Sequence, residues 1–165
     1  IFCSVFFPDI QKRSKEKINS YLMTVLFLMV LFFAIKPVIA DKYYDRGIDF
    51  YISKQYKSAA DNLKKAVHFD KNNPEYYYQL ANINFALYDA DRENGKTYVE
   101  NAVKYTKQSI ELYRHSSQLK MSLASIYSIS GDNENALKYM QEAKDSDPFN
   151  YYIEEQMQKI KLLKG

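Results

Sequence analysis

The chain has 165 residues, enough for one domain, and its four Gly and four Pro are too few for the many tight turns of an all-β protein. The single cysteine, Cys3, excludes a disulfide framework and a thiolate metal site. Five of the 23 basic and two of the 20 acidic residues precede Asp41, so 18 of each sign remain in the body, and this balance argues against binding of nucleic acid.

The first forty residues have the layout of a secretory signal. Residues 1–20 form a basic leader, whose cationic residues are Lys12, Arg13, Lys15 and Lys17. Residues 21–35 form a run of fifteen uncharged, mostly apolar side chains. Val38 and Ala40 then occupy the −3 and −1 positions of a cleavage site of the A-x-A kind. Residues 21–40 are therefore predicted to direct export.

An uncleaved membrane anchor is the alternative for this segment. A spanning helix needs ~20 apolar residues, and extension of the run through Ile39 approaches that length. No cysteine follows Ala40, so we expect no lipid-modified N-terminus. The chain begins with Ile1, which predicts either a fragment or an overextended reading frame, with Met23 as an alternative start. We expect an exported protein, periplasmic or secreted after cleavage, or anchored to the inner membrane without it.

Beyond the leader, a spacing of twelve and then seven residues between small side chains recurs. The three sets are Gly47, Ala59 and Ala66; Ala81, Ala102 and Ser109; and Ala124, Ala136 and Ala143. The middle set is stretched by nine residues between its first two members. Self-similarity of this kind predicts a repeat protein, in which each unit buries its apolar face against the next.

The third set lies in the segment with the fullest pattern, which comprises Leu123-Ala124, Tyr127, Gly131-Asp132, Ala136, Met140, Ala143 and Asp147-Pro148. This pattern resembles the tetratricopeptide repeat (TPR), a helical hairpin of about 34 residues. The resemblance covers residues 41–150 and implies an all-α fold of three TPR-like hairpins stacked as a short right-handed superhelix. The expected repeats are residues 40–73, 74–116 and 117–150, and a capping helix at 151–163 completes the domain 41–165.

The residue chemistry supports these hairpins. Gly47 and Ala59 allow two helices to approach closely, and large side chains such as Leu63 fill the gaps between them. Pro74 and Pro148 mark boundaries between hairpins, because proline cannot continue a helix. The predicted capping helix carries its apolar residues on one face: Ile153, Met157, Ile160 and Leu163.

Several positions depart from the family pattern. Arg46 stands where Leu is usual, Asn84 where Tyr is usual, and Thr106 where a large residue is usual. The nine extra residues of the second repeat, around 89–97, are predicted to lie between its two helices.

The acidic residues of this insertion have the spacing of a calcium loop. Asp89, Asp91, Glu93 and Glu100 fall at its first, third, fifth and twelfth positions. Gly95, however, comes one place too late for the sharp turn that aims the ligands. We expect a solvated turn whose acidic side chains help to start the next helix.

In TPR proteins the first helices of successive hairpins line a concave groove that holds a protein or peptide. By this resemblance, the groove residues are Tyr44, Ile48, Tyr51, Tyr78, Gln79, Asn82, Phe85, Met121, Ser122 and Ser125. Tyrosine, methionine and asparagine suit such a surface, since they combine contact area with a polar or adaptable group. The alternative for several of the tyrosines is that they pack between helices.

One subset of the family clamps the C-terminal carboxylate of its ligand with cationic side chains. The corresponding positions here hold Tyr44, Ile48, Gln79, Gln118 and Ser122, none of which is cationic. We therefore expect no such clamp.

No constellation of residues predicts catalysis. The sequence has no Ser/His/Asp set, glycine-rich phosphate loop or metal-ligand cluster at useful spacing. His68 and His115 each stand near the end of a predicted helix, where a cation is favourable. We expect no enzyme, no cofactor and no metal. The predicted function is an exported protein–protein interaction module, a scaffold or assembly factor of the cell envelope; the alternative is a self-associating structural repeat protein, a homo-oligomer anchored to the membrane.

Overall fold

The computed structural model describes the backbone of residues 7–162 and the side chains of residues 19–162. Over residues 7–162 the secondary structure consists of seven α-helices without strands: α1 (Phe7–Ile52), α2 (Tyr56–Phe69), α3 (Pro74–Ala90), α4 (Gly95–Leu112), α5 (Ser117–Ile129), α6 (Asn133–Ser146) and α7 (Tyr151–Leu162). The chain divides into two compact units between Val38 and Ile39, so α1 contributes residues to both. The all-α class expected from the sequence is confirmed.

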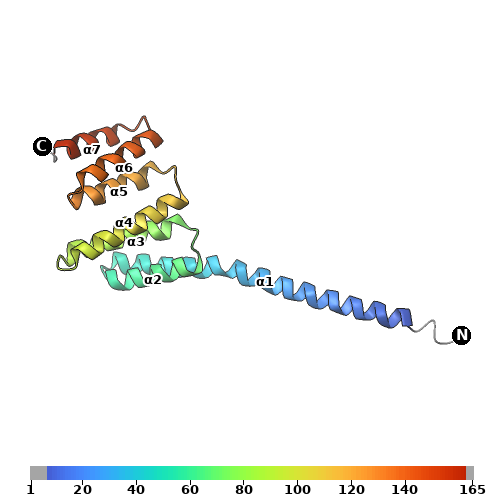
Figure 1. Cartoon of the computed structure of the whole chain (residues 1–165). Helices are drawn as coiled ribbons and strands as arrows, with labels where there is room; N and C mark the ends of the chain where they lie inside the picture. Colours follow the sequence, from blue (N-terminus) through green and yellow to red (C-terminus); the bar gives the residue numbers. More distant parts are fainter. Residues whose placement is uncertain (1–6, 163–165) are drawn as a thin grey trace. The chain divides into compact units, whose positions relative to one another are not determined.

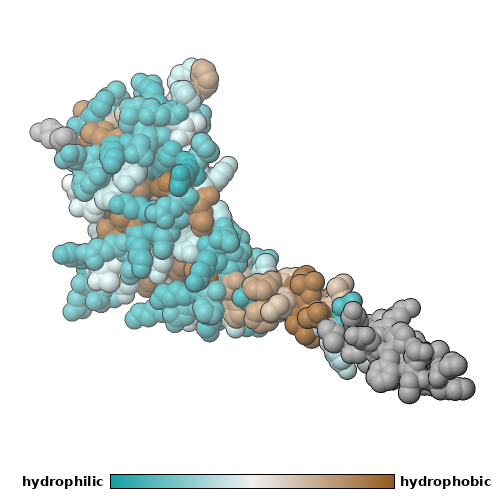
Figure 2. All heavy atoms as spheres, turned by 45° about the vertical axis from the view of Figure 1, so that its right-hand side comes forward, coloured by the Kyte–Doolittle hydropathy of each residue, from teal (hydrophilic) through white to brown (hydrophobic). Residues whose placement is uncertain are grey.

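The described part of the first unit, residues 7–38, is helical, and its last eighteen residues are mostly apolar. From Tyr21 to Val38 its large hydrophobic side chains are exposed, and Figure 2 shows hydrophobic residues along this part of α1. The described stretch of α1, Asn19–Ile52, contains a portion long and apolar enough to cross a membrane, and none of that portion is buried within the protein. Length and composition thus permit a spanning helix, and an export signal near an N-terminus meets the same criteria.

The second unit is a stack of helical hairpins (Figure 1). Residues 39–52 of α1 pair with α2, α3 packs against α4, and α5 packs against α6. Successive hairpins join through α2 with α3 and α4 with α5, and α7 covers α6 at the end of the stack. Each helix therefore buries one face against its neighbours in the chain, which is the organisation of a repeat protein.

The close approach predicted at Gly47 is confirmed. Gly47 is buried, and a Cβ atom built on it would lie 2.9 Å from Cγ of Leu63 and 3.4 Å from the carbonyl oxygen of Ala59. Leu63 is fully buried and belongs to a cluster that continues through Leu80 and Ile83 of α3. A small residue on α1 and a large one on α2 thus set the spacing of the first hairpin.

Two departures from the repeat pattern are accommodated inside the helices. Asn84 is 5% exposed and donates a hydrogen bond from Nδ2 to the carbonyl of Leu80 at 2.7 Å. Thr106 is fully buried and donates from Oγ1 to the carbonyl of Ala102 at 2.8 Å. Both polar groups satisfy their hydrogen bonds within their own helix, so neither disrupts the packing.

Local chemistry explains where helices and turns occur. The capping residues Asn73 at α3, Ser116 at α5 and Asp132 at α6 accept hydrogen bonds from backbone N–H groups of the first turn at 3.0, 3.2 and 3.1 Å. Lys54 and Gly131 have φ angles of 59° and 84°, in the left-handed region, and reverse the chain within the first and third hairpins.

The prediction that the nine extra residues of the second repeat lie between its two helices was wrong, because most of them belong to α3 and α4. α3 is four residues longer than α5, α4 is four longer than α6, and the loop at 91–94 is one residue longer than the loop at 130–132. These differences account for all nine. Four residues are close to one helical turn, so each helix grows by a turn and keeps the same face toward its neighbours.

Tyr76 is expected to make the stability of the fold sensitive to alkali. Its side chain is 2% exposed, and its hydroxyl donates a hydrogen bond to Oδ1 of Asp41. Burial, followed by this hydrogen bond, raises the pKa of Tyr76 above its ordinary value of 10.0. Above about pH 10 the unfolded chain therefore loses the phenolic proton while the folded chain keeps it, and the free energy of unfolding falls as pH rises.

We expect Tyr76→Phe to make this decline shallower, as measured by urea denaturation at a series of values between about pH 9 and 11. Tyr151→Phe, at a position that is 86% exposed, is the matched control and should leave the decline unchanged. Equal slopes for all three proteins would show that the proton of Tyr76 is not coupled to folding.

Candidate functional site

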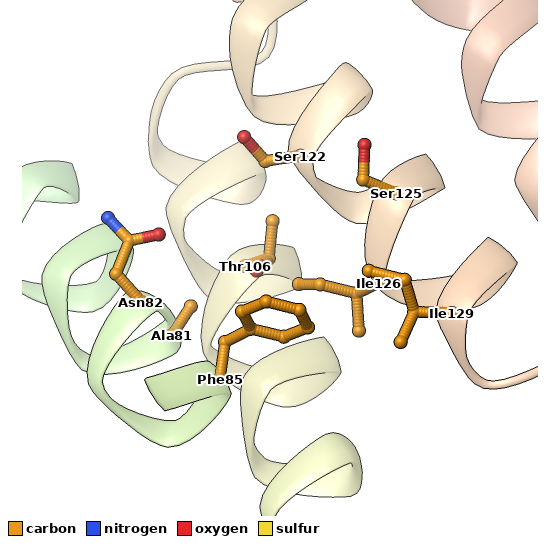
Figure 3. Close-up of a pocket in the computed structure, with 8 residues that line it drawn as sticks. All are labelled: Ala81, Asn82, Phe85, Thr106, Ser122, Ser125, Ile126 and Ile129. Atoms are coloured by element: carbon orange, nitrogen blue, oxygen red, sulfur yellow. The ribbon is translucent and has the colours of Figure 1, made fainter. Parts of the chain in front are cut away.

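A pocket opens between the first helices of the second and third hairpins. Its lining residues are Ala81, Asn82 and Phe85 of α3, Thr106 of α4, and Ser122, Ser125, Ile126 and Ile129 of α5. We call this surface the α3–α5 groove; its volume is about 190 Å³. In Figure 3 the ring of Phe85 faces Ile126 and Ile129 across the groove, with Asn82, Ser122 and Ser125 along one side. The groove thus combines an apolar centre with polar groups at its margin.

Helical periodicity places these side chains together. Ser122, Ser125, Ile126 and Ile129 are spaced at i, i+3, i+4 and i+7, which is one face of α5. Leu123 and Ala124, on the other side of the helix, are fully buried. α5 therefore anchors itself with one face and presents the other to the groove.

The floor of the groove depends on a small side chain. Thr106 lines it from α4, at the position where the repeat pattern has a large residue. The Thr106 side chain is fully buried, and its hydroxyl is bonded to the carbonyl of Ala102 in its own helix. A long side chain at this position would occupy space that the groove now leaves open.

The groove continues along α5 on both sides. A second pocket of about 230 Å³ includes Ser125, Ile129 and Lys159 of α7, and a third of about 410 Å³ includes Ile129 and Tyr88. Ile129 lines all three pockets and is 50% exposed. Ile129 is thus an exposed apolar side chain that three pockets share, and the other two pockets also have charged residues in their lining: Lys159 in the second, and Lys96 and Glu100 in the third.

A row of polar side chains follows α3 beside the groove. Gln79 donates from Nε2 to Oε1 of Glu75 at 2.7 Å, and Asn82 donates from Nδ2 to Oε1 of Gln79 at 3.4 Å. Ser125 donates to the carbonyl of Met121 at 3.0 Å. Carboxamide and hydroxyl groups keep further acceptor positions, which could bind the backbone of an extended polypeptide.

The structure brings four of the ten predicted groove residues into the α3–α5 groove: Asn82, Phe85, Ser122 and Ser125. Tyr44, Tyr51 and Met121 lie elsewhere and pack among helices. The ring of Tyr44 is 5.3 Å from that of Tyr76, and the ring of Tyr51 is 5.8 Å from that of Tyr56. Met121 packs against the cluster around Met140.

The remaining predicted residues, Ile48, Tyr78 and Gln79, are half-buried outside the groove lining. Sequence reasoning missed Ala81, Thr106, Ile126 and Ile129 as groove residues. The two isoleucines could have been found, because they share a helix face with Ser122 and Ser125. Thr106 stood out only as a departure from the repeat pattern.

The residues with calcium-loop spacing do not form a loop. Asp89 lies within α3 and pairs with Arg92 at 2.8 Å, while Glu100 lies within α4. Hydrogen bonds from Asn94 lower the pKa of Asp91. Across residues 19–162, no three His, Cys, Asp or Glu side chains gather into a group able to hold a metal ion.

Solved structures with the same helical arrangement are known. The second TPR domain of human RPAP3, in complex with the HSP70 peptide SGPTIEEVD, matches with a TM-score of 0.63 at 18% identity, covering 78% of this chain and 98% of that chain. The Yersinia enterocolitica type III secretion chaperone SycD, in complex with a peptide of the translocator YopD, matches at 0.64 and 13% identity, covering 76% and 94%. MamA matches at 0.63 and 17% identity, covering 91% and 80%.

No family model and no curated protein sequence matches the chain. The similarity is one of fold: the chain has the TPR fold, as the resemblance of its residue pattern to that family implied.

Proposed function

We propose that this TPR domain is a protein-interaction module that holds an apolar segment of another polypeptide in the α3–α5 groove. The observation that carries the proposal is the half-exposed Ile129, which faces Phe85 across an open groove and joins it to two further pockets. Support also comes from the fold, because the similar domains of human RPAP3 and SycD were each solved with a bound peptide.

The chemistry of the groove defines the ligand class. An apolar ligand side chain would pack on Phe85 and Ile129, and Asn82 and Ser122 would hydrogen-bond the ligand backbone. None of the family's clamp positions supplies a cation for a free C-terminal carboxylate. We therefore propose that the ligand is an internal segment of its protein rather than a C-terminal tail, and that binding, not catalysis, is the function.

We further propose that the module works outside the cytoplasm, as a scaffold or assembly factor of the cell envelope. The support is the basic leader followed by the apolar segment 21–40, which has the order of an export signal.

The test is to identify the ligand by site-specific photo-cross-linking from Ser125, which is exposed and lines two of the pockets. The affinity of the cross-linked segment is then measured for the wild type and for Ile129→Lys. Burial of one isoleucine contributes about 1.5–3 kcal/mol, so we expect Ile129→Lys to weaken binding by about 10- to 100-fold or more.

Ile52→Lys is the matched control. Ile52 is the last residue of α1 as Ile129 is of α5, it is 72% exposed, and it lines none of the three pockets. The Ile52→Lys protein should bind the cross-linked segment with the affinity of the wild type. Equal affinities for the two variants would contradict the groove as the binding site.

A further inference from the structure

The apparent cleavage site lies within the first repeat. Ala40, at the −1 position, is 0% exposed and packs in a cluster with Ala66 of α2 and Tyr76 of α3. Small residues at −3 and −1 are what the processing peptidase requires. Here the small size of Ala40 has a second use, since it allows three helices to meet.

The residues that follow are held by α2 of the first repeat and by Tyr76 of the second. Asp41 accepts a hydrogen bond from the buried hydroxyl group of Tyr76. Tyr43 stacks on Phe69 of α2, with ring centres 5.7 Å apart and an interplanar angle of 7°. Tyr44 packs on Tyr76. Residues 40–44 are thus packed against α2 and α3 within the second unit.

We infer that the chain is not cleaved after Ala40, and that residues 19–38 remain as an anchor in the acyl-chain region of a lipid bilayer. The inference rests on the export proposed above but is independent of what the α3–α5 groove binds. Residues 38–41 are helical, whereas proteolysis concentrates in exposed, irregular segments.

Cleavage after Ala40 would damage the domain. It would remove Ala40 from its cluster with Ala66 and Tyr76 and leave a void. It would also place a new ammonium group on Asp41 at the start of the shortened helix, where the helix dipole disfavours positive charge. The first turn would then begin at 41–44, and terminal turns fray because their backbone N–H groups have no partners within the helix.

The anchor has suitable dimensions. The twenty residues from Asn19 to Val38 form a helix about 30 Å long, close to the thickness of the hydrocarbon core. Lys36 is the one charged residue among them, and its Nζ lies 4.9 and 5.0 Å from the ring centres of Phe32 and Phe33. A lysine near the end of a span can extend its ammonium group to the interface, where aromatic rings also favour lying.

The test uses the full chain with a C-terminal epitope tag, expressed in its native host. Cells are separated into cytosolic, membrane and exported fractions, the membranes are washed with alkaline carbonate, and the intact mass and N-terminal peptides of the tagged chain are determined. A variant, Val38→Gln, replaces the −3 residue with one too large for cleavage; Val38 is 55% exposed, so the substitution should spare the fold.

We expect both proteins in the washed membranes with peptides from residues 21–40 still attached. A soluble exported wild type beginning at Asp41, with Val38→Gln retained in the membrane, would overturn the inference and leave export intact. A full-length wild type in the cytosol would overturn both the anchor and the proposed export. Neither result would bear on ligand binding at Ile129, which is measured separately.

Discussion

Replacing Leu63 by alanine is expected to lower the free energy of unfolding of the repeat domain by about 3–5 kcal/mol. Leu63 is fully buried and lies between Gly47 of α1 and a cluster that includes Leu80 and Ile83 of α3. The lost stability therefore has two parts: the transfer free energy of the removed methyl and methylene groups, and the cost of the cavity that they leave. The cavity persists because rigid helices on both sides limit collapse into the space. The free energy of unfolding of a domain of this size is about 5–15 kcal/mol in total, so the substitution would remove much of its stability.

The measurement is urea denaturation of the purified chain in detergent, followed by circular dichroism. Leu162→Ala, at a position that is 81% exposed, is the control and should change stability by less than about 0.5 kcal/mol. A loss below about 1 kcal/mol for Leu63→Ala would mean that the first hairpin does not pack as described.

A double-mutant cycle makes the prediction sharper. Gly47→Ala alone should destabilise, because the new Cβ would lie 2.9 Å from Cγ of Leu63. In the Leu63→Ala background the clash is gone, and alanine favours helix over glycine by about 1 kcal/mol. We therefore expect Gly47→Ala to be neutral or stabilising in the Leu63→Ala protein. Strictly additive effects would contradict direct contact between the two positions.

Much of the fold could be predicted from the sequence because the repeat spacing reflects direct contacts. A glycine or alanine on one helix must face a large side chain on the next, and the pair Gly47 and Leu63 meets this requirement. Proline at the start of α3 and a capping residue before it fix a helix boundary locally. Such features depend on near neighbours in the chain, so one sequence suffices to locate them.

The insertion was misplaced for a physical reason. Asp89, Asp91, Asn94 and Gly95 are residue types that favour turns, so the extra residues were placed between the two helices of the second repeat. The helices nevertheless extend by one turn each, since tertiary packing overrides weak local preference. In the added region the ring of Tyr88 lies against Gly95 and below the guanidinium group of Arg92, whose Cζ is 4.1 Å from the ring centre.

The candidate site was only partly predictable. The resemblance to the TPR pattern placed Phe85 and Ser125 in a groove. It also placed Tyr44 and Tyr51 there, although these residues pack against other tyrosines. Whether a half-buried tyrosine contacts a ligand or a neighbouring helix depends on the side chains of the next hairpin. Ile129 lines three pockets because side chains of α3, α4 and α7 meet it at the end of α5, and a one-dimensional pattern does not record such contacts.

Ile153→Asp should detach the capping helix. Ile153 is fully buried and, with Ile160, covers Met140 and Ala143 of the third hairpin. An unpaired carboxylate at this position would cost about 3–5 kcal/mol, which is enough to favour an undocked α7. Because repeats contact only their neighbours, we expect local loss of order: amide hydrogens of α6 and α7 should exchange faster, while those of α2 and α3 stay protected.

Tyr152→Asp adds the same charge one residue earlier, at a position that is 57% exposed, and should leave exchange unchanged. Uniform loss of protection in Ile153→Asp would show that the stack unfolds as a single cooperative unit instead.

Undocking also has a consequence for ligand binding, since Lys159 and Ile160 of α7 line the pocket that adjoins Ile129. The Ile153→Asp protein should therefore bind the segment cross-linked from Ser125 more weakly than Tyr152→Asp does, although neither substituted residue lines the groove.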